Sequence, residues 1–377
     1  MKVKLAFSAV LVVFLVLVTD SSVMAADTRA IDTVLKKTVL ETQDFKVIDD
    51  FLAEAVQELV RERDFTTIAR NRSVIISRKG EQPQYVQQFL QSALKHIQAG
   101  FGRAEQLSPE QRKTNVVVNL LILIDGLEDL ALADMALARF KDENAVVRYW
   151  AVHCLSSPAI VQQLNAGAAS NPGPAASIAT QLKDIVDSSS VETLALIAGF
   201  GATIDIPQGE ELLLQVADAR IKRYADWTVK HELSEIALLK LLESKLPLSS
   251  QGPGGAVPAG LGKPAIAQRF AQLYSYAIQR YLKGQGVLND TQKDHLASVL
   301  VEVQEKCVSR LLGTPQTTFR RAIERANLAA IVDEHNGLLG NGTTAGQLPS
   351  KLGFDYGTDS AGAKRMAPIP LSDPVAK

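Results

Sequence analysis

The chain has 377 residues, with 40 lysines and arginines against 41 aspartates and glutamates and a formal net charge of −1 at pH 7. Nucleic-acid binding needs a concentrated basic surface, so this near-neutral balance argues against a nucleic-acid partner. Two cysteines are too few for a disulfide scaffold, and abundant alanine and leucine with only 6% aromatic residues favour helices.

Residues 1–26 have the pattern of a secretory signal peptide. Lys2 and Lys4 give a positively charged start, an apolar run fills residues 5–18, and a cleavage point follows Ala25 or Ala26. The apolar run has 14 residues. A membrane-spanning helix needs ~20, which makes an uncleaved anchor the weaker alternative. We therefore expect a soluble periplasmic or extracellular protein with no stable membrane span after cleavage.

From residue 27 onward the apolar residues mostly recur at helical spacing, as in Phe45, Leu52 and Leu59. Each such helix has one apolar face that needs a neighbour. The spacing predicts an all-α fold of about 10 to 12 helices. They lie near residues 41–63, 65–78, 83–99, 109–140, 144–156, 174–187, 190–200, 209–246 (with a possible break), 264–283, 290–312 and 316–334. The β-branched run VVVNLLILI at 116–124, taken alone, fits a buried strand equally well.

The sequence DENAVVRYWAVHCL at residues 142–155 is the most informative part of the chain. Val147, Ala151 and Leu155 lie on one face at helical spacing. Asp142 precedes them and is well placed to accept hydrogen bonds from free backbone amides at the helix start.

This sequence resembles the second helix of a HEAT repeat, with residues 119–140 as the first helix. No second copy of equal quality is present. The resemblance implies an α-solenoid-like stack of antiparallel helix pairs, in which Arg148 bonds across to a neighbouring repeat. It also implies that the stack binds a protein or peptide partner, although this step from fold to role is an analogy.

Three stretches rich in Gly, Pro and Ser interrupt the helical pattern: 165–174, 246–264 and everything after Asn336. The tail has too few large apolar residues to bury itself. Its portion MAPIPLSDP favours extended polyproline geometry, which suits an inert tail or a docking peptide. The sequence thus divides into a leader at 1–26, a HEAT-like region at 27–246, a Gly/Pro-rich loop at 247–264, a C-terminal helical region at 265–336 and a disordered tail at 337–377.

Cys154 and Cys307 lie among apolar residues on helical faces and have the pattern of small buried residues. A disulfide between them is the alternative.

The sequence contains no complete set of catalytic or metal-binding residues. His231 and Glu235, in the sequence HELSE, share a face if this segment is helical, but the second histidine of a zinc-protease helix is missing. Ser92 and Lys95 have the S-x-x-K spacing of penicillin-binding enzymes without the partner motifs. We therefore predict no metal, no cofactor and no catalytic residue.

Clustered Tyr, Trp and Arg residues are typical of binding hot spots. The sequence offers two such groups as partner-binding candidates: Arg148, Tyr149 and Trp150 in the HEAT-like helix, and Tyr224 and Trp227 further along. The alternative is that the tryptophans fill the core between helices.

The function that these features favour is a secreted, non-catalytic helical scaffold that binds protein or peptide. Two alternatives stay open: a secreted helical hydrolase that uses paired carboxylates, and a carrier whose helices enclose an apolar ligand.

Overall fold

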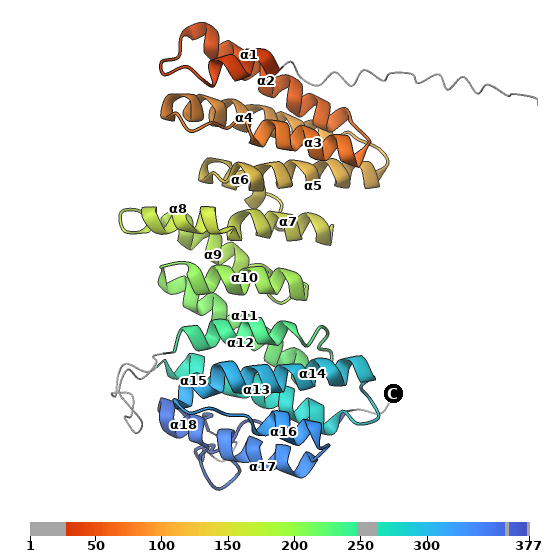
Figure 1. Ribbon diagram of the computed structural model, residues 1–377, viewed down its shortest axis with the longest axis vertical. Helices are drawn as coiled ribbons and strands as arrows, with labels where there is room; N and C mark the ends of the chain where they lie inside the picture. The colour runs from red at the N-terminus through yellow and green to blue at the C-terminus, as the bar shows by residue number, and fades with distance from the viewer. Residues whose placement is uncertain (1–27, 247–262, 359–361, 375–377) are drawn as a thin grey trace, which may run out of the picture. The chain divides into compact units, whose positions relative to one another are not determined.

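The computed structural model describes residues 28–246, 263–358 and 362–374, and every regular element in these ranges is a helix (Figure 1). The predicted all-α fold is confirmed. One compact unit ends at His96 and a second begins at Ile97. The predicted leader and most of the predicted loop at 247–264 lie outside the described residues. None of the described helices is both long enough and apolar enough to cross a membrane.

The first unit contains α1 (Thr28–Val34), α2 (Thr42–Arg61), α3 (Phe65–Ile76) and the first part of α4 (Pro83–Ala104). The apolar stripe of α2 is buried as its spacing predicts, with Ile48, Leu52 and Leu59 fully inaccessible. Asp64 caps α3 by accepting a hydrogen bond from the Thr67 amide at 2.7 Å.

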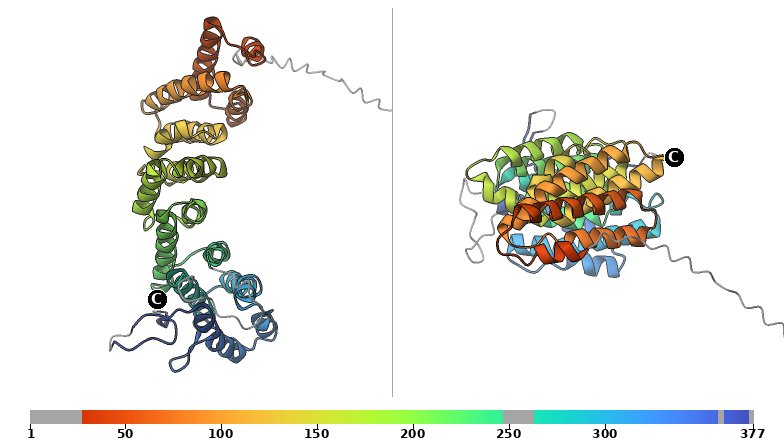
Figure 2. Two further views of the ribbon diagram at one scale, coloured as in Figure 1. Left: turned by 90° about the vertical axis from the view of Figure 1, so that its left-hand side faces the viewer. Right: turned by 90° about the horizontal axis from the view of Figure 1, so that it is seen from above.

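The second unit begins with helices that pack on near neighbours in the sequence. They are α5 (Glu110–Leu127), α6 (Ala133–Leu137), α7 (Ala145–Ser156), α8 (Pro158–Ala168), α9 (Gly173–Ile185), α10 (Val191–Thr203) and α11 (Pro207–Ala225). Helix α7 packs on α5 and α6, and α10 packs on α7 and α11 (Figures 1 and 2). Helix α8 occupies part of the predicted loop at 165–174.

The strand alternative for residues 116–124 is wrong, because α5 buries apolar side chains on most of its circumference. The predicted helix at 109–140 is interrupted instead at Glu128, which adopts a left-handed φ of 49° and ends α5. Asp129 then accepts from the Ala131 amide at 2.9 Å and opens a new turn. Glu128 and Asp129 therefore end one helix and begin the next, where apolar spacing alone predicts a single continuous helix.

The C-terminal helices gather around α13 (Pro264–Lys283), which packs on α11, α12, α14, α17 and α18. These neighbours are α12 (Ser234–Ser244), α14 (Asp290–Val303), α17 (Leu328–Leu339) and α18 (Gln347–Leu352), with the shorter α15 (Ser309–Leu312) and α16 (Thr318–Glu324) beside them. The sequence places a domain boundary at 247–264, yet helices from both sides of it pack directly on one another. The apolar face of α13 is the reason, because Phe270, Leu273 and Ala277 are completely buried.

The prediction of a disordered tail is wrong for its described part. Helix α17 continues to Leu339, α18 follows, and the Tyr356 hydroxyl donates to the Leu339 carbonyl oxygen at 2.9 Å. Leu348 and Leu371 are almost inaccessible, at 0% and 1% exposure. The tail has few large apolar residues, but most of them, including Leu348, Phe354 and Leu371, are buried.

Both cysteines are buried and free, so the disulfide alternative is not formed. The Cys154 thiol donates to the Leu121 carbonyl oxygen at 3.2 Å. Burial raises the pKa of both thiols, that of Cys307 to about 12.

Candidate functional site

The first predicted binding group lies on α7, and its arginine acts locally. Arg148 Nη1 donates to the carbonyl oxygens of Asp142 and Glu143 at 2.7 and 2.8 Å, in the turn before its own helix. The bond across to a neighbouring repeat, which the HEAT resemblance implies, is not the one that forms. The helix cap is Asn144, which accepts from the Val146 amide at 2.9 Å. Asp142 accepts from the Asn144 amide instead.

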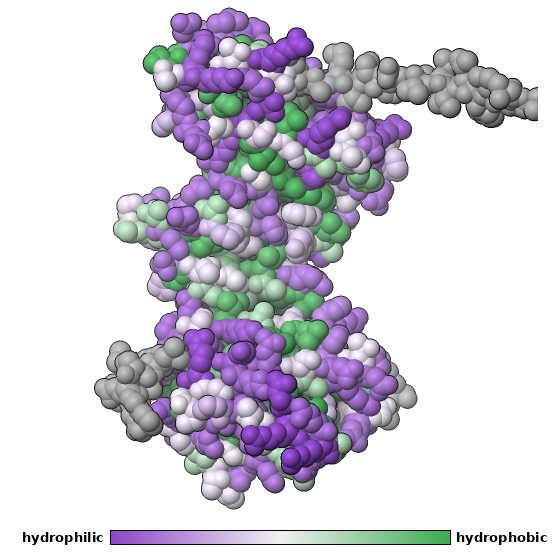
Figure 3. All heavy atoms as spheres, in the orientation of Figure 1, coloured by the Kyte–Doolittle hydropathy of each residue, from purple (hydrophilic) through white to green (hydrophobic). Residues whose placement is uncertain are grey.

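The aromatic residues of α7 form a partly exposed cluster. The rings of Tyr149 and Trp150 meet edge to face with centroids 5.7 Å apart, and His153 lies 5.0 Å from Trp150. His153 Nδ1 lies 3.0 Å from a carboxylate oxygen of Asp125 on α5, which fixes the imidazole. On the face drawn in Figure 3, hydrophobic residues show between polar ones over α5 to α12, whereas the surface over α14, α16 and α17 is mostly hydrophilic.

The second predicted group divides into a core residue and a surface residue. Tyr224, near the end of α11, is fully buried, and its hydroxyl has no hydrogen-bond partner among the described residues. Its side chain is not accessible to a partner, so the prediction for Tyr224 is wrong. Trp227 is partly exposed, directly after α11, at a left-handed φ of 56°.

Two buried ion pairs lie close to this end of α11, and the arginine of one of them, Arg280, has its guanidinium carbon 5.0 Å from the Trp227 ring centroid. Arg220 on α11 donates from Nε to Glu235 on α12 at 2.9 Å, and Arg280 on α13 approaches Glu232 at 3.3 Å. Burial raises the pKa of Glu235, against the opposing effect of Arg220. The sequence HELSE therefore does not form one helical face that could bind a metal ion, because α12 begins only at Ser234. His231 lies before it at a φ of 57°, and Glu235 is engaged by Arg220.

The S-x-x-K spacing also fails to form a site. Ser92 is buried, while Lys95 extends to Asp49 at 2.9 Å. Among the residues that the structure describes, no three His, Cys, Asp or Glu side chains are grouped so as to hold a metal ion.

Trp227 contacts an extended segment that the sequence places in the tail. Its indole N–H donates to the Ser372 carbonyl oxygen at 2.9 Å. The side-chain amide of Gln272 on α13 donates to the Ile369 carbonyl oxygen at 3.1 Å and accepts from the Ile369 N–H at 2.8 Å. This double contact resembles the pairing of one β-strand with another.

Two further residues of α13 continue the row. Gln279 accepts from the Leu371 N–H at 2.7 Å, and Lys283 donates to the Leu371 carbonyl oxygen at 2.6 Å. Lys283 also pairs with Asp373 at 2.8 Å. Since Gln272, Gln279 and Lys283 are spaced by 7 and 4 residues, they lie on one face of α13. We call the surface formed by these three side chains and Trp227 the tail groove, and residues 366–374 the tail segment.

A cavity of about 1260 Å³ opens at the C-terminal end of the tail groove. It is lined by residues 225–230, which run from the last residue of α11, by the turn at 286–288, by residues 372–374 of the tail segment, and by Arg280 and Gln292. Half of these residues are polar or charged, and Trp227, Val229, Val287 and Leu288 add an apolar part to the lining. The carboxylates of Glu232 and Glu235 nearby are buried and paired with arginines.

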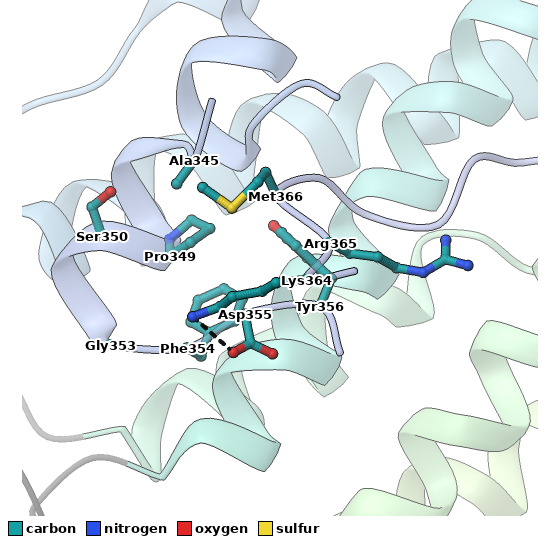
Figure 4. Close-up of a pocket in the computed structure, with 10 residues that line it drawn as sticks. All are labelled: Ala345, Pro349, Ser350, Gly353, Phe354, Asp355, Tyr356, Lys364, Arg365 and Met366. Atoms are coloured by element: carbon teal, nitrogen blue, oxygen red, sulfur yellow. Dashed lines mark ion pairs between the residues drawn. The ribbon is translucent and has the colours of Figure 1, made fainter. Parts of the chain in front are cut away.

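A smaller cavity of about 330 Å³ lies where the chain passes from α18 into the tail segment (Figure 4). Pro349, Phe354 and Met366 line it, and Lys364 closes it through an ion pair with Asp355 at 3.2 Å. Arg365 points away from it in Figure 4. Among the described residues that line this cavity, no nucleophile lies beside a base.

The sequence pointed to part of the tail groove and missed the rest. Trp227 and the extended geometry of 366–374 were legible from residue types. Gln272, Gln279 and Lys283 carried no signal, because polar residues at helical spacing are what any exposed helix face has.

Comparison of the chain with family models, with curated proteins and with solved structures found no match. The HEAT resemblance therefore stays a prediction from residues 119–155.

Proposed function

We propose that this protein is a secreted, non-catalytic helical scaffold that binds extended segments of protein, and that the tail groove is where it binds them. The observation that supports this most is the double hydrogen bond between the Gln272 amide and the main chain of Ile369. Contacts to main-chain groups tolerate many sequences, as in domains that bind a peptide as an added strand.

Specificity in such a groove comes from side-chain pockets. Leu371 is 1% exposed, whereas Ile369, two residues earlier, is 45% exposed. An apolar residue at the Leu371 position and an acidic residue at the Asp373 position, facing Lys283, are therefore the features that a bound segment would share with the tail. In the free protein the tail segment is itself the occupant.

The test is binding of a labelled peptide, AKRMAPIPLSDP, which copies residues 363–374. The receptor is the full chain with Leu371→Asp, which expels the tail segment because burying an unpaired carboxylate is costly. The matched control is Ile369→Asp, where the new charge stays in water. We expect fluorescence anisotropy to show binding by Leu371→Asp and at least tenfold weaker binding by Ile369→Asp.

Adding Gln272→Ala and Gln279→Ala to the Leu371→Asp chain removes three main-chain hydrogen bonds. Each contributes about 1 kcal/mol, so affinity should fall more than tenfold. If the Leu371→Asp chain keeps its helical circular dichroism and binds no peptide, the proposal is wrong. It is also wrong if the two alanine substitutions leave affinity unchanged.

A further inference from the structure

We propose that the tail groove selects segments in the polyproline II conformation, and that the partner segment carries the pattern Pro-x-x-Leu-x-Asp-Pro. This inference rests on the proposed function, because a partner segment must first take the place of the tail segment. It names the class of segment by the backbone geometry that the groove accommodates.

The exposure of the tail segment repeats every three residues. Pro368 and Leu371 are buried, Pro374 is partly exposed, and the two residues that follow each buried one are exposed. In a β-strand alternate residues share a face, so Ile369 and Leu371 would be buried or exposed together. Their exposures are instead 45% and 1%. A polyproline II helix has three residues per turn, which places residues 368, 371 and 374 on one side.

Side chains of α13 bind the main-chain groups that a polyproline II helix leaves free. Such a helix has no internal hydrogen bonds. Gln272 accepts from the Ile369 N–H at 2.8 Å and donates to the Ile369 carbonyl oxygen at 3.1 Å. Leu371 donates its N–H to Gln279 at 2.7 Å and accepts from Lys283 at 2.6 Å. A side-chain amide offers both a donor and an acceptor, so these contacts do not require a strand.

Trp227 adds an aromatic residue to the groove. Its indole N–H donates to the Ser372 carbonyl oxygen at 2.9 Å. Grooves that bind proline-rich segments in the polyproline II conformation are lined by aromatic residues. The tail groove therefore combines an aromatic residue with hydrogen-bond donors that are directed at carbonyl groups of the segment.

The prolines of the tail segment lie where the groove binds no N–H group. Pro368, Pro370 and Pro374 have no N–H, whereas Ile369 and Leu371 supply the N–H groups that the glutamines accept. Each proline fixes its own φ at about −65°, which suits polyproline II and not a β-strand. It also restricts the residue before it to extended backbone. The segment therefore loses little conformational entropy when it enters the groove.

The experiment measures binding of labelled peptides that copy residues 363–374 to the full Leu371→Asp chain. Pro370 is exposed, so a substitution there changes the conformational preference of the peptide and leaves its buried contacts in place. Pro370→Gly in the peptide should weaken binding about tenfold and Pro370→Val about threefold, because the unbound peptide becomes less restricted. A groove that binds strands would instead bind the Val peptide at least as tightly as the original, since valine favours strands.

Three further peptides test the three-residue repeat. Pro368→Asp and Leu371→Asp should each abolish binding, because the new carboxylate would be buried. Ile369→Asp is the matched control, since its carboxylate stays in water, and it should change affinity by no more than about twofold.

Equal affinities of the original, Pro370→Gly and Pro370→Val peptides overturn the selection of polyproline II and leave the proposed function standing. A loss of binding with Ile369→Asp as large as that with Leu371→Asp also overturns it, because both side chains would then face the groove. If the Leu371→Asp chain keeps its helical circular dichroism and binds none of the peptides, the proposed function fails and this inference fails with it.

If the Leu371→Asp chain does not fold, hydrogen–deuterium exchange of residues 366–374 in the otherwise unmodified chain supplies the measurement. Pro370→Gly should speed exchange of this segment about tenfold and Pro370→Val about threefold, because the released segment gains the same conformational freedom as the peptide. Exchange rates that neither substitution changes would overturn the inference.

Discussion

The indole N–H of Trp227 donates to the carbonyl oxygen of Ser372, which lies 2.9 Å away and 145 residues later in the chain. A left-handed backbone is unfavourable for a residue as bulky as tryptophan, and Trp227 adopts a φ of 56°. Its ring is stabilised there by Arg280 and by the tail segment. Trp227 therefore connects the end of α11, the buried ion pairs and the tail groove.

Trp227 should report directly on release of the tail segment. The chain has two tryptophans, so Trp150→Phe leaves Trp227 as the only indole fluorophore. In that background we expect Leu371→Asp to increase acrylamide quenching of the fluorescence, because the ring loses its cover. Ile369→Asp should leave quenching unchanged. Equal quenching in the two variants would show that the tail segment does not cover Trp227.

The contact between α10 and α11 requires Gly201. A Cβ atom on Gly201 would lie 2.7 Å from the Gly209 carbonyl oxygen, whereas one on Gly199, in the same helix, meets nothing within 4 Å. Gly201→Ala should lower the free energy of unfolding by about 1 to 3 kcal/mol through overpacking. Gly199→Ala should raise it by about 0.5 to 1 kcal/mol, as expected for alanine in a helix. Urea unfolding measures both, and similar values for the two variants would contradict the close approach.

The buried pair of Arg220 and Glu235 should be far more sensitive to substitution than a surface pair. Arg220→Met leaves a buried carboxylate uncompensated and should destabilise by about 3 to 5 kcal/mol. Adding Glu235→Leu should restore most of the loss. Lys46 and Asp50 form an exposed pair, at 66% and 63% side-chain exposure. Lys46→Met should change stability by less than about 1 kcal/mol. The assigned role of the buried pair is contradicted if Arg220→Met lowers the unfolding temperature no more than Lys46→Met does.

His335 should make the protein sensitive to acid. It lies on α17 and is partly buried, with Nε2 at 2.9 Å from the Ser275 hydroxyl of α13, and burial lowers its pKa below 6.5. Because the unfolded chain takes up this proton at higher pH than the folded chain, stability should fall as pH drops below 6.5 towards the folded-state pKa.

His335→Gln removes that titration and should flatten the dependence of the unfolding free energy on pH between about 7 and 5. His231 is exposed. His231→Gln should keep the acid sensitivity of the original chain. Identical pH profiles for His335→Gln and the original chain would rule out the assigned role of His335.

Apolar spacing predicted the helices well because burial of one face decides where a helix forms. The helix expected at 264–283 begins and ends as predicted, since its apolar stripe is long and uninterrupted. The break at Glu128 was missed, because a local polar residue decides the backbone there. The break between α11 and α12 falls inside the helix at 209–246, for which the sequence left a break open.

The tail was misjudged for a different reason. Its order comes from long-range hydrogen bonds between polar side chains of α13 and main-chain groups of Ile369 and Leu371. The extended geometry of the tail segment follows from its sequence, but the polar side chains of α13 carry no recognisable pattern. Their separation from the tail segment in the sequence also exceeds any periodicity. Of the five candidate binding residues, Trp227 lies in the tail groove, Arg148 supports its own helix, Tyr149 and Trp150 form a separate surface, and Tyr224 belongs to the core.

The most direct test of the tail groove is hydrogen–deuterium exchange of residues 366–374 in the unmodified chain, followed by mass spectrometry. The amides of Ile369 and Leu371 donate to Gln272 and Gln279, so we predict that this segment exchanges much more slowly than an unstructured peptide of the same sequence. Gln272→Ala with Gln279→Ala should return it to the fast rate. Exchange of the unmodified segment at the rate of the free peptide would contradict the account.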